Sequence, residues 1–302
     1  MPDGKFDYNR AGYEKVICNL CGQDRLEPIS QVDRYGLPVR TVICRNCGLI
    51  FINPRMSRVD YDRFYQMAYR EQLEKYKGWS RKIDLDKLFI KTTDLGRELV
   101  ERIGSHINSG LTLEVGSSCG GVLNGLKLAR PDLEIFGLEP SFTEADYASR
   151  KNIKTHVSMF ENFQEPIPSL KNIFIVRSFN HLLDPAGFIK WSHQQLSSDG
   201  KLVIMVIDFL EACRRRGGLK TQIDHPYMFT RETLSSFVEN GGFKVEYNVA
   251  DGDYVYLVAK KDGRVPFGRL EVDLKVYRNV RKNLGRVRLW YHHQFNKLLD
   301  LK

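Results

Sequence analysis

Two pairs of cysteines near the amino terminus have the spacing of metal ligands. Cys18 and Cys21 form one Cys-x-x-Cys pair, and Cys44 and Cys47 form the other. A glycine follows each pair and tolerates the backbone dihedral of a tight turn that aims both sulfurs at one ion. Four thiolates make a closed tetrahedral set that suits structural Zn²⁺. Iron or redox chemistry and unliganded cysteines are the alternatives.

A glycine-rich segment further along the chain has the composition of a nucleotide-binding turn. The apolar run 111–115 is typical of a strand, and Gly116-Ser-Ser-Cys-Gly120 follows it before a helical segment. Such a turn brings the backbone close to a nucleotide-like ligand at the helix N-terminus. A second strand-like run ends at Glu139, about twenty residues beyond the turn, where a carboxylate can accept two hydrogen bonds from a ribose diol.

The glycine-rich turn and the strand after it match two family motifs. Glu114–Gly120 has the form acidic-x-Gly-x-Gly-x-Gly, with Ser118 at the middle glycine, and Gly137–Ser141 matches the second motif. The chain therefore resembles the class I S-adenosylmethionine-dependent methyltransferases. The acid before the loop disfavours a pyrophosphate, which favours the cationic S-adenosylmethionine over NAD. The resemblance implies these cofactor contacts: Glu114, Gly116 and Gly120 at the amino-acid end, Glu139 at the ribose, Ser158, Met159 and Phe160 near the adenine, and Ser118, Pro140 and Arg177 elsewhere.

Four side chains are candidates for the chemistry of methyl transfer. An in-line displacement from a sulfonium needs a positioned nucleophile and a group that removes its proton. Such groups are expected at the carboxyl ends of the fourth and fifth strands, over the methyl group of the cofactor. The candidates at these positions are His181, Asp208, His225 and Tyr227.

Two of these candidates lie in runs that match known segments. Asp224–Thr230 is similar to the Glu-His-x-x-Tyr-Phe-Ser segment of the zinc-bearing sugar C-methyltransferases, whose histidine and tyrosine face the substrate. His225 is accordingly expected to be a substrate-facing base, or else a cap of the helix that starts near residue 230. Arg177–Pro185 is similar to the family's Glu-His-x-x-Asp-Pro signature, with Asn180 in place of the acid. His181 is a functional candidate or a packed loop histidine.

The elements that must position these residues alternate between helix and strand. We expect a helical segment at about 80–107, and then strands at 111–115, 134–139, 153–157, 173–176, 201–207, 243–249 and 254–260. The last two form an antiparallel hairpin. This order predicts an α/β, Rossmann-like seven-stranded sheet with helices on both faces. The expected divisions are a zinc ribbon at 1–56, a helical linker at 57–110, the cofactor-binding domain at 111–262 and a basic amphipathic helical tail at 263–302.

Basic charge is concentrated in the carboxyl-terminal tail. The net charge is +9, and the segment from residue 264 onward holds ten Lys or Arg against three acids. The expected partner of this helix is the body of the protein or a second subunit, an anionic membrane surface, or nucleic acid. A second basic run, Arg214–Arg216, is followed by two glycines. It is expected to be a lid that binds a phosphorylated substrate, or a plain solvated loop.

Two features of the sequence bear on the location of the protein in the cell. No apolar run is long enough to cross a bilayer, and Met1–Lys5 lacks the pattern of a secretory signal. A cytoplasmic location is expected, with the inner membrane face as an alternative through the tail.

The motifs together predict a methyltransferase that acts on a small molecule or glycan. O-methylation of a sugar hydroxyl in polysaccharide or natural-product biosynthesis is the favoured reaction. The chain has only about forty residues after the last expected strand, where the sugar C-methyltransferases have a large domain, which disfavours C-methylation. An RNA methyltransferase and a non-catalytic scaffold with the same fold are the alternatives.

Overall fold

A seven-stranded mixed sheet forms the centre of the described structure. The computed structural model describes residues 6–67, 84–163, 166–167, 169–268 and 273–299. The strand order is β12-β13-β10-β9-β6-β7-β8. The strands are β6 (Gly110–Val115), β7 (Leu133–Leu138), β8 (Thr155–His156), β9 (Leu170–Val176), β10 (Leu196–Ile207), β12 (Phe243–Asp251) and β13 (Tyr254–Lys261). All pairs are parallel except β10–β13 and β12–β13. This confirms the Rossmann-like sheet and its closing hairpin.

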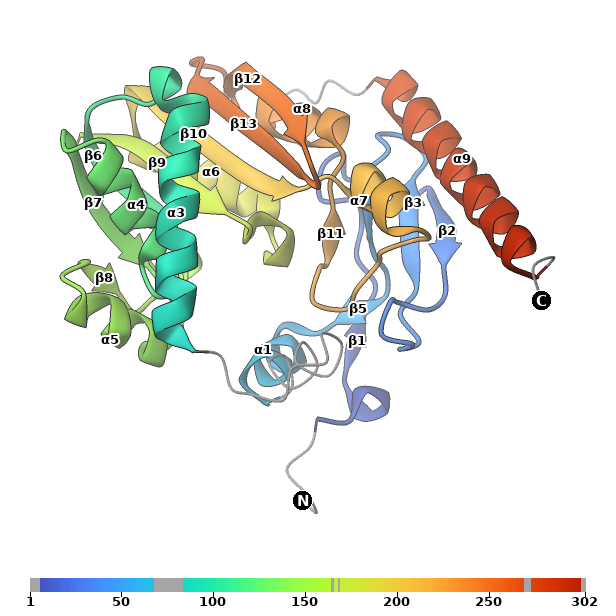
Figure 1. Ribbon diagram of the computed structural model, residues 1–302. Helices are drawn as coiled ribbons and strands as arrows, with labels where there is room; N and C mark the ends of the chain where they lie inside the picture. The colour runs from blue at the N-terminus through green and yellow to red at the C-terminus, as the bar shows by residue number, and fades with distance from the viewer. Residues whose placement is uncertain (1–5, 68–83, 164–165, 168, 269–272, 300–302) are drawn as a thin grey trace.

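Helices cover both faces of this sheet. They are α3 (Leu85–Ile103), α4 (Gly121–Ala129), α5 (Phe142–Arg150), α6 (Pro185–Gln195) and α8 (Arg231–Asn240). Successive strand residues face opposite sides, so each strand supplies both cores. On β9, Ile173 and Ile175 belong to the core that includes α6 and α8. The intervening Phe174 belongs to the core that includes α3 and α4, which lie together on the near side of the sheet in Figure 1.

The bounds of two elements differ from the sequence expectation. The helix expected at about 80–107 is α3, where Asp84 accepts hydrogen bonds from the N–H groups of residues 86 and 87. Its expected first residues, 80–83, lie outside the described residues. A separate 3-10 turn, Gly104–His106, follows the helix. The third strand is only two residues long, because its backbone pairs with β7 at just two positions, Gly137 with Thr155 and Leu138 with His156.

The amino-terminal module contains three strands of a second, four-stranded sheet. Its order is β11-β4-β3-β2, with β2 (Leu26–Ser30), β3 (Thr41–Cys44), β4 (Ile50–Ile52) and β11 (Tyr227–Met228), all antiparallel. The strand β11 comes from far along the chain, so the module's sheet is completed by a segment that lies between β10 and β12 of the central sheet. Two short strands, β1 (Tyr13–Glu14) and β5 (Arg55–Met56), pair beside it, and α1 (Arg58–Met67) follows.

The carboxyl-terminal helix α9 (Leu274–Leu299) packs against the module (Figure 1). Val280, Leu284 and Val287 are buried in the core that includes β3 and β4. Glu27 on β2 accepts a hydrogen bond from Tyr277 at 2.8 Å and pairs with Arg281. Of the partners considered for the tail, the described part of the helix therefore contacts the body of the protein. The side chains beyond residue 287 lie outside the described ones.

The second basic run is helical and engaged in ion pairs. It belongs to α7 (Phe209–Arg216), whereas the sequence indicated a lid or a loop. Arg215 and Arg216 both pair with Asp253, and Arg214 pairs with Glu211. In the part of the chain that the structure describes, no helix has both the length and the apolar character needed to cross a membrane.

Candidate active site and metal centre

The glycine-rich turn connects the end of β6 to α4. Gly116 and Gly120 have φ of +73° and +80°, and Ser118 has φ of +50°. Positive φ is readily adopted by glycine and rarely by other residues, so Ser118 holds an uncommon conformation at the position of the missing middle glycine. A Cβ on Gly137 of the neighbouring strand would lie 2.3 Å from the hydroxyl of Ser117. The turn therefore favours glycine at Gly116 and Gly120, and it requires glycine at Gly137 on the neighbouring strand β7.

Two carboxyl groups face this turn. Glu139 accepts hydrogen bonds from the N–H groups of Ser118 and Ser141, both at 2.8 Å. Glu114 is 2% exposed, and its Oε2 atom has no hydrogen-bond partner among the described residues. Burial, with a further contribution from the charge of Glu139, raises the pKa of Glu114 well above its usual value. A buried carboxyl with an unsatisfied oxygen fits the ammonium group of an amino-acid moiety, which would stabilise its ionised form.

The other expected cofactor residues differ in how available they are. Ser158 and Met159 are half-buried after β8, and Pro140 is exposed after β7. Phe160 is buried against Phe188 and Trp191, with ring centroids 5.3 and 5.8 Å away. Its ring therefore belongs to the core and does not lie open to an adenine.

Arg177 ends β9 in an unusual conformation. Its φ is +60°, and its guanidinium lies 4.6 Å from the ring centroid of Tyr254. The buried Nε atom has no hydrogen-bond partner in the described part of the chain. Backbone strain of this kind persists where the surrounding structure holds it, often at functional sites.

Two of the candidate catalytic residues, His181 and His225, lie against each other. Their ring centroids are 4.6 Å apart, and one ligand atom from each, with one from Asp224, falls within 4.8 Å. Nδ1 of His181 lies 2.8 Å from the backbone oxygen of Asp224. Because a carbonyl oxygen only accepts, Nδ1 carries the proton and Nε2 keeps a lone pair. The side-chain nitrogen of Gln222 lies 2.5 Å from each ring nitrogen of His225.

Burial sets the protonation states of this cluster. It lowers the pKa of His181 to about 4. It also lowers the pKa of His225 well below 6.5, with the neighbouring His181 as the second cause. Burial raises the pKa of Asp224 to about 7. Both imidazoles are therefore neutral at pH 7, the form in which a histidine can take a proton.

The remaining two candidates have structural partners. Asp208 is the N-cap of α7 and accepts hydrogen bonds from the N–H groups of Leu210 and Glu211. Tyr227 is 2% exposed, pairs with Phe51 between β11 and β4, and has its hydroxyl 3.3 Å from Arg55. These partners of Asp208 and Tyr227 are residues other than His181 and His225.

The alternative role of His225 as a helix cap is filled by another residue. Thr230 caps α8, and its side chain and that of Thr233 form a reciprocal capping box. His225 is thus left for a different role.

The four cysteines of the module converge. The Sγ atoms of Cys18 and Cys47 are 3.4 Å apart, and those of Cys21 and Cys44 are 3.6 Å apart. All four lie within 4.8 Å of one another and are buried. These separations exceed the roughly 2.05 Å of a disulfide. They approach the ~3.8 Å that four sulfurs keep around Zn²⁺ at about 2.3 Å, so the set fits a tetrahedral ion.

The sequence did not predict the contact between the amino-terminal module and the loop at residues 221–226, which carries His225. Residues 33–36 lie between the two cysteine pairs of the module. The Asp33 carboxylate accepts a hydrogen bond from the N–H of Ile223 at 3.0 Å, and Arg34 donates to the side chain of Gln222 at 2.8 Å. These pairs are about 190 residues apart in sequence, and no local pattern signals such a contact.

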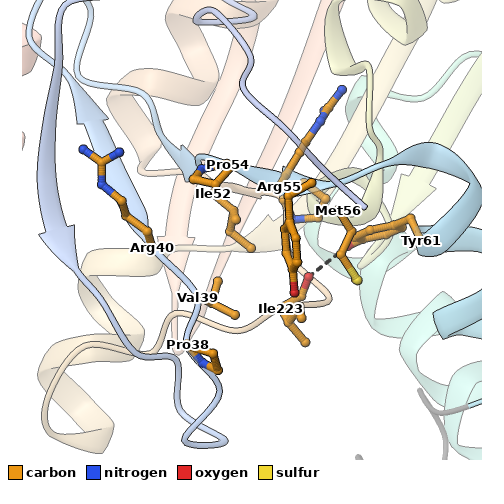
Figure 2. A pocket seen from close by; sticks show the side chains of 11 residues that line it. Pro38, Val39, Arg40, Ile52, Pro54, Arg55, Met56, Tyr61 and Ile223 are labelled. Atoms are coloured by element: carbon orange, nitrogen blue, oxygen red, sulfur yellow. Dashed lines mark hydrogen bonds between the residues drawn. The ribbon is translucent and has the colours of Figure 1, made fainter. Parts of the chain in front are cut away.

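A cavity of about 150 Å³ lies on the other flank of the same loop. Ile223 and Pro226, which flank His225, form part of its wall. Figure 2 shows that the head groups of Arg40 and Arg55 point away from it, while the Tyr61 hydroxyl bonds to the backbone of Ile223. The module thus contacts the loop through apolar side chains as well as through hydrogen bonds.

Comparison with known proteins agrees with the class that the fold and the glycine-rich turn define. The family model for a methyltransferase domain matches residues 91–248, more than half of the chain. The chain belongs to this family and is an S-adenosylmethionine-dependent methyltransferase.

Solved structures of low sequence identity resemble parts of the chain. One is a SAM-dependent methyltransferase from Aquifex aeolicus, at 19% identity and a TM-score of 0.46 over 60% of this chain and all of that one. Another is described as a possible histamine N-methyltransferase from Thermotoga maritima, at 17% identity and a TM-score of 0.47 over 64% of this chain and 97% of that one. No curated protein matches the chain.

Proposed function

We propose that this methyltransferase transfers the methyl group to a hydroxyl of a sugar, as part of a glycan or small molecule made in polysaccharide or natural-product biosynthesis. The observation that supports this most is a pair of neutral histidines, the half-buried His181 after β9 and the buried His225 before β11. A hydroxyl acceptor must lose its proton during transfer, and a neutral imidazole can take it.

The residues divide between holding the cofactor and handling the acceptor. S-adenosylmethionine, when bound, supplies an electrophilic methyl group on a sulfonium. Glu114 and the turn 116–120 would hold its amino-acid end, and Glu139 its ribose. His225 would take the proton of the acceptor hydroxyl, while His181, fixed by its bond to the Asp224 carbonyl, orients the ring of His225. Aligning acceptor and methyl in this way provides most of the rate enhancement in such a displacement.

We further propose that the four cysteines hold a structural Zn²⁺. A closed set of four thiolates leaves no coordination position for a substrate. The ion would hold together the module at residues 1–56, whose core alone is small. Residues 57–110 and 111–262 would be the linker and the cofactor-binding domain.

The tail at 263–302 supports a separate proposal about partners. Lys275, Arg278, Lys282 and Arg286 are exposed on α9, while its apolar side packs on the module. We propose that this basic row contacts an anionic surface such as a membrane.

The first experiment is calorimetric titration of S-adenosylmethionine and S-adenosylhomocysteine into the wild type and Glu139→Ala, on protein whose metal content has been measured. We expect binding by the wild type and a loss of at least tenfold in the variant. Binding that is equal in both would contradict the assigned ribose contact. Absence of binding to folded, zinc-replete wild type would overturn the proposed function.

The second experiment tests the base. S-adenosylhomocysteine release is followed with hydroxyl-bearing sugar acceptors for the wild type and His225→Gln. The variant should bind the cofactor normally and lose about 10²-fold or more in kcat. Unchanged turnover would exclude His225 as the base.

A further inference from the structure

A small cavity lies beside His225, at the meeting point of four segments. Its lining includes seven residues with polar side chains, which are Asn180, Gln222, His225, Tyr227, Arg34, Arg216 and Lys220. These come from the turn after β9, β11 with the loop before it, the tip of the module and α7. The cavity volume is about 20 Å³, close to the space that one water molecule occupies. It therefore admits one polar group of a larger molecule, not a whole sugar ring.

Asn180 is the feature of this cavity that points to a ligand. The residue is 3% exposed, and neither Nδ2 nor Oδ1 has a hydrogen-bond partner among the described residues. Buried amides are almost always hydrogen-bonded. An amide offers both a donor and an acceptor, which matches a hydroxyl group. The residue also stands where the family resemblance implies an acid, so this chain has a neutral amide at that position.

The charges around the cavity are not balanced. Arg34 lies near Asp224 and Asp33, and Arg216 shares Asp253 with Arg215. Lys220 is half-buried and forms no ion pair within the described part of the chain. One cation at the cavity therefore lacks a counter-charge, and one carboxylate serves two guanidinium groups.

We propose that this cavity is the acceptor subsite and that the acceptor carries an oxyanion, a carboxylate or a phosphate, near the hydroxyl that is methylated. The cavity admits the reacting hydroxyl, which Asn180 holds beside His225, and the oxyanion stays outside the cavity, where Lys220, with Arg216 and Arg34, holds it. Charge-assisted hydrogen bonds of this kind are stronger than neutral ones. This inference rests on the proposed function and adds the chemical class of its substrate.

The test is calorimetry on the full chain saturated with S-adenosylhomocysteine. The probes are glucuronate, glucose 6-phosphate and glucose. We expect one anionic probe to bind at least tenfold more tightly than glucose. Glucuronate alone identifies a carboxylate, and glucose 6-phosphate alone identifies a phosphate. Lys220→Gln should weaken the anionic probe about tenfold. Lys244→Gln, an exposed lysine on β12, is the matched control and should change nothing.

The outcomes separate this inference from the proposed function. Glucose that binds as tightly as both anions, or an anion affinity unchanged in Lys220→Gln, overturns the oxyanion subsite. If S-adenosylhomocysteine binds but none of the three probes does, the subsite is overturned while the proposed function stands. Asn180→Ala tests the floor of the cavity separately. It should weaken every probe, glucose included, without changing the affinity for S-adenosylhomocysteine, and unchanged probe affinities would remove Asn180 from the subsite.

Discussion

Asp224 is a carboxyl group buried beside two imidazole rings. It is 3% exposed, and burial raises its pKa to about 7. In the unfolded chain the same group has a pKa near 3.8. The folded protein therefore holds this proton more tightly than the unfolded chain does. The stability it contributes is fully present below about pH 3.8 and is lost as the pH rises to about 7.

This linkage predicts how Asp224→Asn behaves with pH. The variant lacks the titrating group, so its free energy of unfolding should rise relative to wild type between pH 5.5 and pH 7 and level off above about pH 8. Urea denaturation across this range measures the difference. Asp199→Asn is the control, because the pKa of that exposed carboxyl is lowered by Lys171 and it stays ionised throughout. A difference for Asp224→Asn that does not change with pH would contradict the raised pKa.

Some residues could be located from the sequence because a local pattern carries the information. Cys18 and Cys21 reveal each other by their spacing, and Glu139 by its distance from the glycine-rich turn. His225 was a candidate from its segment, but its partners Gln222 and His181 could not be assigned. Burial and hydrogen bonding decide which histidine is neutral, and both depend on segments brought together only by folding.

At the scale of elements, α3 and α4 pack through glycines. A Cβ on Gly125 would lie 2.0 Å from the backbone oxygen of Thr93 and 2.8 Å from the Cα of Gly96. A Cβ on Gly96 would lie 2.3 Å from the backbone oxygen of Val122. The two helix backbones are therefore in direct contact. This contact holds α4, which follows the glycine-rich turn, against α3.

Gly125→Ala should accordingly destabilise the fold. Backbone atoms cannot move aside as a flexible side chain can, so we expect a loss of about 1–3 kcal/mol in the free energy of unfolding. Gly285→Ala on α9 is the matched control, since a Cβ there meets nothing within 4 Å. That change should be neutral or stabilising by up to about 1 kcal/mol. Denaturant unfolding of both variants measures the contrast, and equal effects would rule out the close helix contact.

Element type was easier to predict than element partnership. The helical spacing of Leu95, Leu99 and Ile103 predicted α3, and all three residues are buried. The strand β11 has only two residues and pairs with β4 at Tyr227–Phe51 and Met228–Ile50. Two residues carry no usable periodicity, so no local pattern indicated that the segment after His225 joins the module's sheet.

At the scale of the whole molecule, the amino-terminal module is hydrogen-bonded to the loop that carries His225. The hydrogen bonds that join them besides the β11 pairing run from Arg34 N to Thr221 O, from Thr221 Oγ1 to Val32 O, from Arg34 Nη1 to Gln222, from Ile223 N to Asp33 and from Ile52 N to Pro226 O. In contrast, the glycine-rich turn and Glu139 bond within the central domain. The residues proposed to hold the cofactor and those proposed to hold the acceptor thus depend on different parts of the fold.

This separation predicts what removal of the metal does. If the four cysteines hold Zn²⁺, a chelator should unfold the module, because metal binding and folding are coupled in such small sites. The amides of residues 221–228 should then exchange faster with solvent, and turnover should fall by at least tenfold. The affinity for S-adenosylhomocysteine should change by less than about threefold, because Glu114 and Glu139 lie outside the module. Hydrogen exchange and calorimetry on the same metal-depleted sample measure the two effects.

A variant distinguishes loss of the loop contact from loss of the module. Asp33→Asn leaves all four cysteines in place but weakens the bond that the carboxylate accepts from Ile223. It should keep its zinc and its cofactor affinity, speed exchange at residues 222–224, and lower turnover by less than chelation does. If metal removal abolished cofactor binding in parallel with turnover while Asp33→Asn changed neither exchange nor rate, the module would support the whole fold and not this loop. If the hydrogen bonds between the module and the loop position His225, weakening one of them should speed amide exchange in the loop and lower turnover together.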